Sequence, residues 1–186
     1  MSIHSLLNKM NIIKRIHLKK IRSNPVEWAK FIGVNMRGDV HIYGRVSWST
    51  EPWIISLGKN VHITDGVRFV THDGGTLLYR SQVPDLEITK PITVGDNVYI
   101  GNCVIILPGV SIGNNCIIGA GAVVSKSIPD NSVAVGVPAR VIKTSEEYFN
   151  KIKEESLHLG HLKGKEKDDA LKHFYGYKGN SKGIYY

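Results

Sequence analysis

Cysteine is scarce in this chain of 186 residues, which has Cys103 and Cys116 and no others. Two cysteines are too few for a disulfide framework or a four-cysteine zinc site. No apolar run approaches the roughly 18 residues that a membrane span requires. Basic residues interrupt the apolar stretches after the first Met, so no secretory signal is expected. These absences favour a reduced, cytoplasmic location and a globular protein.

Acidic residues are also few, since 16 Asp and Glu oppose 24 Lys and Arg, for a formal charge of +8. Most of the excess lies in residues 1–30, which carry a net +6, whereas residues 31–143 and 144–186 each carry +1. The body of the chain is therefore nearly neutral, and nucleic acid is not expected as a partner.

Residues 2–21 place apolar side chains every three or four positions, which predicts an amphipathic helix with a basic opposite face. Pro25 disfavours a helical conformation at Asn24, so a break is expected there. Two roles remain open for this segment. It packs on the domain or on a neighbouring subunit, or it makes peripheral contact with an anionic membrane.

A six-residue period dominates the middle of the chain, and neither the helix nor the strand period explains it. Each hexad has one aliphatic residue and a second apolar residue four positions later, as in Val94 and Val98, Ile100 and Val104, Ile106 and Val110, Ile112 and Cys116, Ile118 and Ala122, and Val124 and Ile128. This pattern predicts an all-β parallel solenoid with three hexads, or 18 residues, per turn and aliphatic residues stacked inside. Glycine and asparagine then occupy the corners, at Lys59-Asn60, Asp96-Asn97 and Asn114-Asn115.

The period also sets the limits of the repeat region. The register reaches back through 57–69 and, more loosely, 36–46, and a phase slip of three predicts a small insertion at 49–54. After Ile142 the period stops, and helices are expected over 146–157 and 165–174.

Several motifs together resemble the hexapeptide-repeat acyltransferases, in particular the maltose, galactoside and capsular-polysaccharide O-acetyltransferases. The resemblance covers roughly residues 32–143 and rests on Thr71-His72-Asp73-Gly74-Gly75, Val98-Tyr99-Ile100-Gly101, Leu107-Pro108-Gly109-Val110, Ile118-Gly119-Ala120-Gly121-Ala122-Val123-Val124 and Val135-Gly136-Val137-Pro138-Ala139-Arg140-Val141-Ile142. It implies a left-handed β-helix, against the right-handed rule for parallel crossovers. It also implies a homotrimer with active sites between neighbouring prisms and acetyl-CoA as the acyl donor.

The chain is therefore expected to divide into a basic helical extension (1–30), a repeat domain (31–143) and a helical tail (144–186). The repeat is suspended between Phe69 and Val94, where an excursion loop over 75–91 provides a wall for a ligand site.

His72 lies at the base of this loop. An imidazole that is neutral near pH 7 can take the proton of an acceptor hydroxyl, and the resemblance identifies His72 as the catalytic base. Asp73 orients the imidazole, or it closes the loop or binds substrate. Tyr79 and Arg80 on the loop are candidates for contact with the acceptor.

For the donor, the resemblance places the pantetheine arm along the Gly101-Asn102 and Gly119-Ala120 turns, with Tyr99 near the thiol end. Backbone N–H groups at such a turn could stabilise the thioester oxyanion. Ser125 and Lys126 follow in the next turn, and Lys126, Arg140 and Lys143 are spaced to meet the phosphates of coenzyme A, with Pro138 against adenine. The alternative is that these three cations are ordinary solvated charges.

The leading function is therefore acetyl transfer from acetyl-CoA to a hydroxyl of a sugar or surface-polysaccharide precursor. Because Cys116 holds an inward apolar position, direct transfer is favoured over an acetyl-cysteine. The alternatives are an antibiotic O-acetyltransferase and a non-catalytic solenoid scaffold. A zinc carbonic anhydrase needs three convergent histidines, which the spacing of His41, His62 and His72 does not suggest, so no metal is expected.

Overall fold

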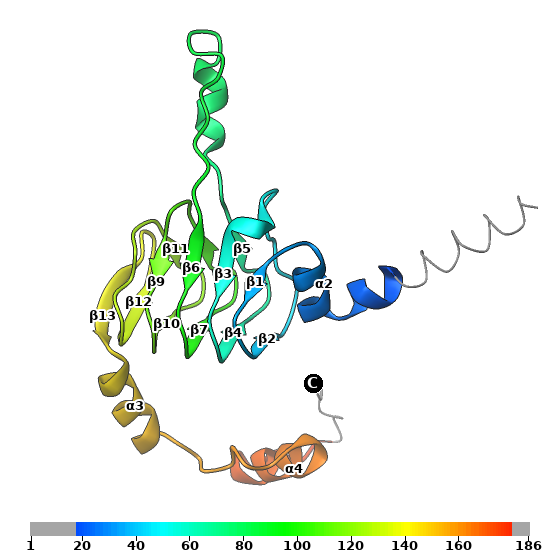
Figure 1. Ribbon diagram of the computed structural model, residues 1–186. Coiled ribbons are helices and arrows are strands. Elements are labelled where there is room, and N and C mark those ends of the chain that lie inside the picture. The colour runs from blue at the N-terminus through cyan, green and yellow to red at the C-terminus, as the bar shows by residue number, and fades with distance from the viewer. Residues whose placement is uncertain (1–17, 180–186) are drawn as a thin grey trace, which may run out of the picture. The chain divides into compact units, whose positions relative to one another are not determined.

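The computed structural model describes residues 18–179 (Figure 1). Most of the amphipathic helix predicted over residues 2–21 lies outside them; residues 18–23 are helical. The chain divides between Glu146 and Glu147 into two compact units, each taken by itself below. No described helix is both long and apolar enough to cross a bilayer.

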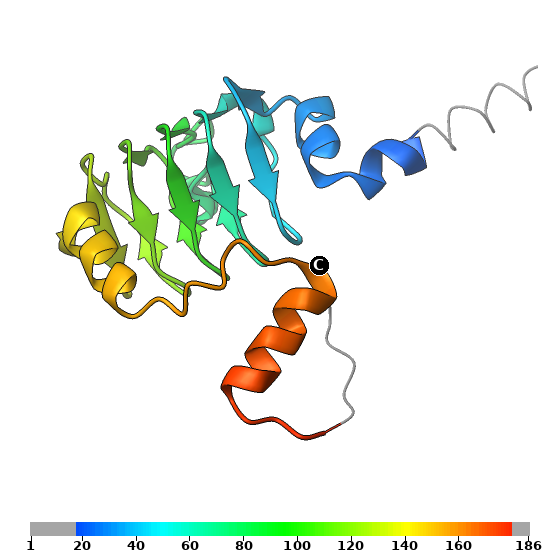
Figure 2. The ribbon, with the colours of Figure 1, turned by 90° about the horizontal axis from the view of Figure 1, so that it is seen from below.

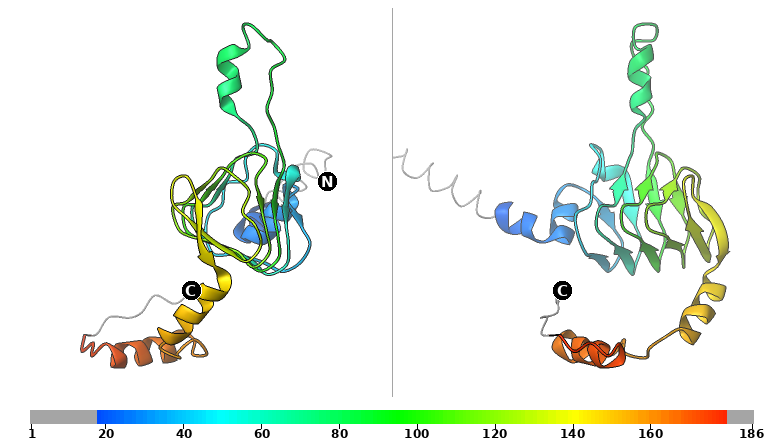
Figure 3. Two further views of the ribbon diagram at one scale, coloured as in Figure 1. Left: turned by 90° about the vertical axis from the view of Figure 1, so that its left-hand side faces the viewer. Right: turned by 180° about the vertical axis from the view of Figure 1, so that it is seen from behind.

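Successive strands of the first unit pass from one parallel sheet to the next and wind the chain into a three-sided coil, seen along its axis in Figure 3 (left). The first sheet contains β1 (Asn35–Met36), β3 (Ile55–Leu57), β6 (Ile92–Val94) and β9 (Ser111–Ile112). The third contains β5 (Arg68–Phe69), β8 (Ile105–Ile106) and β11 (Val123–Val124).

The second sheet is the widest and is seen face-on in Figure 2. It contains β2 (Val40–Ile42), β4 (Val61–Ile63), β7 (Val98–Ile100), β10 (Ile117–Ile118), β12 (Ser132–Val135) and β13 (Arg140–Thr144). The β12–β13 pair is antiparallel, and the other strand pairs are parallel.

The strand register confirms the predicted parallel stacking at a period of 18 residues. Tyr99 pairs with Ile117, and Ile106 pairs with Val124, each one turn further along the chain. The two apolar positions of every hexad from Val94 to Ile128 are at most 6% exposed. The interior is thus one continuous aliphatic stack, which stabilises the coil by the removal of apolar surface from water.

Asparagines hold the predicted corners in a left-handed backbone conformation. Asn60, Asn97, Asn115 and Asn131 have φ values of 53 to 56°, which asparagine adopts more readily than most residues. Their amides form a ladder, in which each Nδ2 donates to the Oδ1 of the next asparagine at 2.9 to 3.1 Å.

The phase slip near 49–54 is a real insertion, as predicted. Ser49 has a φ of 62°, and a 3-10 turn, η1 (Pro52–Ile54), returns the chain to β3. The insertion projects Glu51 and its neighbours from the corner that follows the third sheet.

The predicted excursion between β5 and β6 projects from the coil (Figure 1) and contains the 3-10 helix η2 (Gly74–Tyr79). Backbone hydrogen bonds close its base, since Asp73 N–H donates to Ile88 O at 2.9 Å and Lys90 N–H donates to Thr71 O at 2.8 Å. The loop therefore leaves and re-enters the coil at a fixed place.

The predicted break before Pro25 is confirmed, but the helix that follows it was not expected from the sequence. This helix, α2 (Pro25–Phe31), has Asn24 as its N-cap, whose side chain accepts from the N–H groups of Val26 and Glu27. It packs against β2, at one end of the coil.

Two helices follow the coil, as predicted. They are α3 (Ser145–Glu154), which ends three residues before the expected limit, and α4 (Gly164–Phe174) in the second unit. Neither contains a buried residue. The predicted limits of the N-terminal extension, repeat domain and tail stay predictions.

Candidate functional site

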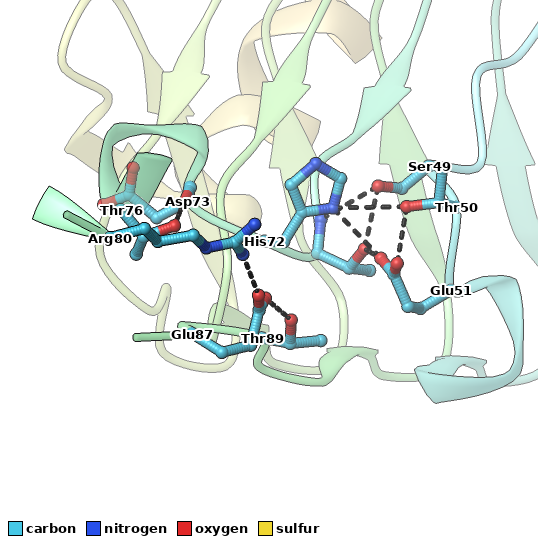
Figure 4. A network of polar contacts seen from close by, with 10 residues as sticks. Ser49, Thr50, Glu51, His72, Asp73, Thr76, Arg80, Glu87 and Thr89 are labelled. Atoms are coloured by element: carbon cyan, nitrogen blue, oxygen red, sulfur yellow. Dashed lines mark hydrogen bonds and ion pairs between the residues drawn. The ribbon is translucent and has the colours of Figure 1, made fainter. Parts of the chain in front are cut away.

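The insertion and the base of the excursion meet at His72 (Figure 4). His72 Nδ1 lies 3.0 Å from Glu51 Oε2. The Thr71 hydroxyl donates to the same carboxylate oxygen at 2.6 Å, and the Thr50 hydroxyl donates to Oε1 at 2.5 Å. Ser49 Oγ in turn lies 2.8 Å from the Thr71 hydroxyl.

These contacts set the charge of Glu51. Hydrogen bonds from Thr50, Thr71 and His72 lower the pKa of its carboxyl from 4.5 to about 2, because each donor stabilises the ionised form. Glu51 is therefore a carboxylate throughout the neutral range.

The carboxylate also fixes the tautomer of His72. An ionised carboxylate only accepts hydrogen bonds, so the proton of a neutral imidazole lies on Nδ1 and leaves a lone pair on Nε2. Figure 4 shows Nε2 directed away from Glu51, and no described residue bonds to it. The arrangement presents a proton acceptor at a half-exposed position.

Asp73 does not orient the imidazole. Its carboxylate caps η2 and accepts from Gly75 N–H at 2.9 Å. This contact corresponds to loop closure, one of the roles of Asp73 that the sequence left open. The orienting carboxylate is Glu51, which sequence reasoning missed. The available signal was an acidic residue inside the insertion that the phase slip located.

His72, Asp73 and Gly74 line two hollows. One, of about 470 Å³, is mostly apolar and includes Lys90 and Ser125 with Val70, Ile88, Leu107 and Pro108. The other, of about 250 Å³, is mostly polar and includes Thr50, Glu51, Thr76, Leu77, Arg80 and Glu87. Arg80 donates to Glu87 at 2.7 Å there, whereas Tyr79 lines neither hollow and is 55% exposed.

The predicted donor residues fall into two groups. Ser125 lines the apolar hollow of His72, and Lys126 and Arg140 face a further hollow of about 310 Å³ with Ser127 and Ile128. Pro138 follows a cis peptide bond just before Arg140, and Lys143 lies on β13 in the second sheet. One chain thus brings Ser125 to the hollow of His72, and Arg140 to the hollow that Lys126 lines.

The second group does not share a hollow with His72 within one chain. Tyr99 is on the outward face of the second sheet, and Gly101, Asn102, Gly119 and Ala120 are at the corner that follows it. A Cβ atom on Gly101 would lie 2.6 Å from Ala120 N, so turn packing accounts for this glycine. The pantetheine contact predicted for these residues stays a prediction.

The described residues hold no group of three or more metal-ligating side chains. His41 and His62 stack on the second sheet with ring centroids 4.6 Å apart, away from the His72 corner. Cys116 is fully buried, as predicted, and burial raises the pKa of its thiol.

Comparison with known proteins agrees with this architecture. Residues 91–126 match the bacterial transferase hexapeptide family (six repeats). Protein CapG of Staphylococcus aureus is 40% identical over 158 residues, which cover 83% of this chain and 92% of CapG. The chain belongs to the hexapeptide-repeat transferase family.

Two further relatives of the transferase are named for acetyl transfer. Galactoside O-acetyltransferase of Escherichia coli K12 is 36% identical over 143 residues, covering 61% of this chain and 70% of that protein. The crystal structure of a maltose O-acetyltransferase from Clostridium difficile 630 aligns with a TM-score of 0.51 at 27% identity, over 72% of this chain and 87% of that one. The transferase is accordingly an acyltransferase.

Proposed function

We propose that this enzyme transfers an acetyl group from acetyl-CoA to a hydroxyl of a sugar or surface-polysaccharide precursor, with His72 as general base. The Glu51–His72 pair between two hollows carries the proposal. The galactoside and maltose O-acetyltransferases among its relatives support a sugar acceptor.

The chemistry follows from the two ring nitrogens. Nε2 of His72 accepts the hydroxyl proton as the acceptor oxygen attacks the thioester carbonyl carbon. The Glu51 carboxylate stabilises the imidazolium that forms. When the tetrahedral species collapses, the carbon–sulfur bond breaks and His72 returns the proton to the departing thiolate. The acetyl group passes directly to the acceptor without an acetyl-enzyme.

The two hollows suit the two substrates. The apolar hollow with Ser125 binds the thioester. Lys126 and Arg140, which line the further hollow, bind the phosphates of coenzyme A because both side chains are cationic. The polar hollow with Asp73 and Arg80 takes the acceptor.

The proposal includes a left-handed β-helix and a homotrimer, as the resemblance to the family implies. A neighbouring subunit then supplies Tyr99 and the Gly101 and Gly119 turns to the site formed at His72. Lys143 and Pro138 complete the coenzyme A contacts in this account.

An acceptor screen tests the substrate class. The purified chain is given acetyl-CoA with a panel of glycosides and of hydroxylated antibiotics, and free thiol release is followed. Turnover on glycosides supports the proposal, whereas turnover only on antibiotics would move the enzyme to xenobiotic inactivation. Failure to bind acetyl-CoA at all would favour a non-catalytic scaffold.

A further inference from the structure

A basic hollow lies on the outward face of the third sheet, outside the site described above. It measures about 520 Å³ and includes Arg45, Ser47, Arg68 and Cys103, with Val46, Gly66, Val67 and Ile105. We propose that this hollow binds the anionic group, phosphoryl or carboxylate, of the acceptor, so that the enzyme acetylates acidic or phosphorylated sugars. The inference rests on the proposed function and specifies its acceptor.

Neither guanidinium of the hollow is neutralised at short range. No described residue bonds to the side chain of Arg68, and the Arg45 side chain is 97% exposed with its Nε 4.0 Å from Asp65 Oδ1. That Asp65 oxygen instead accepts the Arg45 backbone N–H at 2.7 Å. Two largely uncompensated guanidinium groups beside one hollow favour an anion, which arginine binds with paired N–H donors.

A second hollow, of about 190 Å³, continues the first and shares Arg45 and Val46 with it. It adds Arg22, whose guanidinium lies 4.8 Å from the centre of the Trp28 ring, and Trp48. Trp28 stacks on Phe31 and Trp48 is buried against Phe69, so the second hollow contributes a third arginine to the path formed by the two hollows rather than an open ring face.

The position of the path links it to His72. Arg68 lies in β5 of the third sheet, four residues before His72 at the corner that follows this sheet. Ser47 similarly precedes Ser49, which contacts Thr71, by two residues. At about 3.3 Å per residue the Arg68–His72 span is at most about 13 Å. A disaccharide or a sugar phosphate covers that span with a hydroxyl at one end and an anion at the other.

The test compares galactose 1-phosphate, galacturonate and galactose as probes. In calorimetric titrations of the intact chain we expect both anions to bind at least tenfold more tightly than galactose. Arg68→Gln should lower this ratio of affinities about tenfold. The affinities for galactose 1-phosphate and for galacturonate show whether the hollow prefers a phosphoryl group or a carboxylate. Arg37→Gln is the matched control, because Arg37 is an exposed arginine that lines neither hollow.

Cys103 supplies a readout that does not depend on activity. It is exposed in the hollow, whereas Cys116 is buried, so alkylation by iodoacetamide reports on Cys103. Galactose 1-phosphate should slow this alkylation in the wild type and in Arg37→Gln, and should not slow it in Arg68→Gln. Arg68→Lys, which keeps the charge and loses the paired donors, should show partial protection.

Kinetics separate this proposal from the proposed function. Arg68→Gln should raise KM for the anionic acceptor about tenfold and leave KM for acetyl-CoA unchanged. Equal losses in Arg68→Gln and Arg37→Gln, or a raised KM for acetyl-CoA alone, would overturn the anion site while acetyl transfer stands. Anion binding that depends on Arg68 without turnover on any sugar would instead overturn the proposed function, and with it the acceptor assignment.

Discussion

A single carboxylate determines what the histidine of this site can do. Glu51 holds Nδ1 of His72 and accepts two threonine hydroxyls, so its charge, the imidazole tautomer and the free Nε2 are set together. Asp73, the neighbour of His72 in the sequence, does not orient the imidazole, because its carboxylate caps η2.

Replacing Glu51 by Gln tests this positioning role. We expect kcat to fall while KM for acetyl-CoA is unchanged, because the amide cannot stabilise the imidazolium and can hold the wrong tautomer. A steady-state comparison with Glu27→Gln, an exposed carboxylate on α2, provides the control. Equal kcat values for the wild type and Glu51→Gln would contradict the positioning role.

The same residue should make stability depend on pH. The pKa of Glu51 is lowered from 4.5 to about 2, so its ionised form contributes stability that is complete above about pH 4.5 and is lost as the pH falls toward 2. Urea midpoints of the wild type and Glu51→Gln should therefore differ most near pH 6 and converge as the pH falls toward 2. A difference that grows in acid would show that the carboxylate is not stabilised by these donors.

At the scale of the elements, hexads repeat with fixed side-chain roles, so one turn of the coil is copied onto the next. The asparagine ladder shows the rule, since each corner needs a left-handed backbone conformation and an amide that bonds to both neighbours. Asn97 lies inside the ladder and meets both requirements, since it has a φ of 55° and bonds to Asn60 and Asn115.

Two substitutions of Asn97 separate the effect of the left-handed conformation from that of the ladder hydrogen bonds. Asn97→Gly loses the ladder bonds but tolerates the φ of 55°, whereas Asn97→Ala loses the bonds and adds strain. We expect Asn97→Ala to be less stable than Asn97→Gly by about 1 kcal/mol, as measured by urea unfolding. A more stable alanine variant would mean that the corner relaxes out of the left-handed conformation.

The repeat explains what the sequence could predict. Inward aliphatics, corner asparagines, the excursion and the insertion all follow from one period and its interruptions, and the structure places them as expected. The role of Glu51 could not be assigned from the sequence. The repeat pattern shows where the hexads are interrupted, but it does not show how the inserted residues fold. Helix α2 was missed because its seven residues carry no long apolar period.

The three faces of the coil differ in chemistry at the scale of the molecule. The first sheet presents hydroxyls outward, such as Thr93 and Ser111. The second presents the rings of His41, His62 and Tyr99, and the third presents Arg68 beside Ile105. A homotrimer is proposed here, with the ring-bearing second sheet contributing Tyr99 to a neighbour's site.

Light scattering on the purified chain tests this assembly. The expected mass is three times that of the 20.6 kDa chain. A monomer that turns over acceptor at the full rate would contradict the shared site.

The basic segment 2–21 makes a separate prediction. If it meets membrane, the protein should sediment with anionic vesicles at low salt and not with neutral ones, since the attraction to anionic lipid is screened by salt. Deletion of residues 2–16 should abolish sedimentation while leaving the acetyl-transfer rate unchanged. Equal partition with both kinds of vesicle would leave only the packing role.

The most direct test of the account is thiol release from acetyl-CoA by the His72→Ala variant with an accepted sugar. We expect the rate to fall at least 100-fold, while acetyl-CoA binding is retained. His161→Ala, which removes an exposed imidazole between α3 and α4, should keep the wild-type rate. Full turnover by His72→Ala would contradict the assignment of His72 as the base, and with it the role given to Glu51.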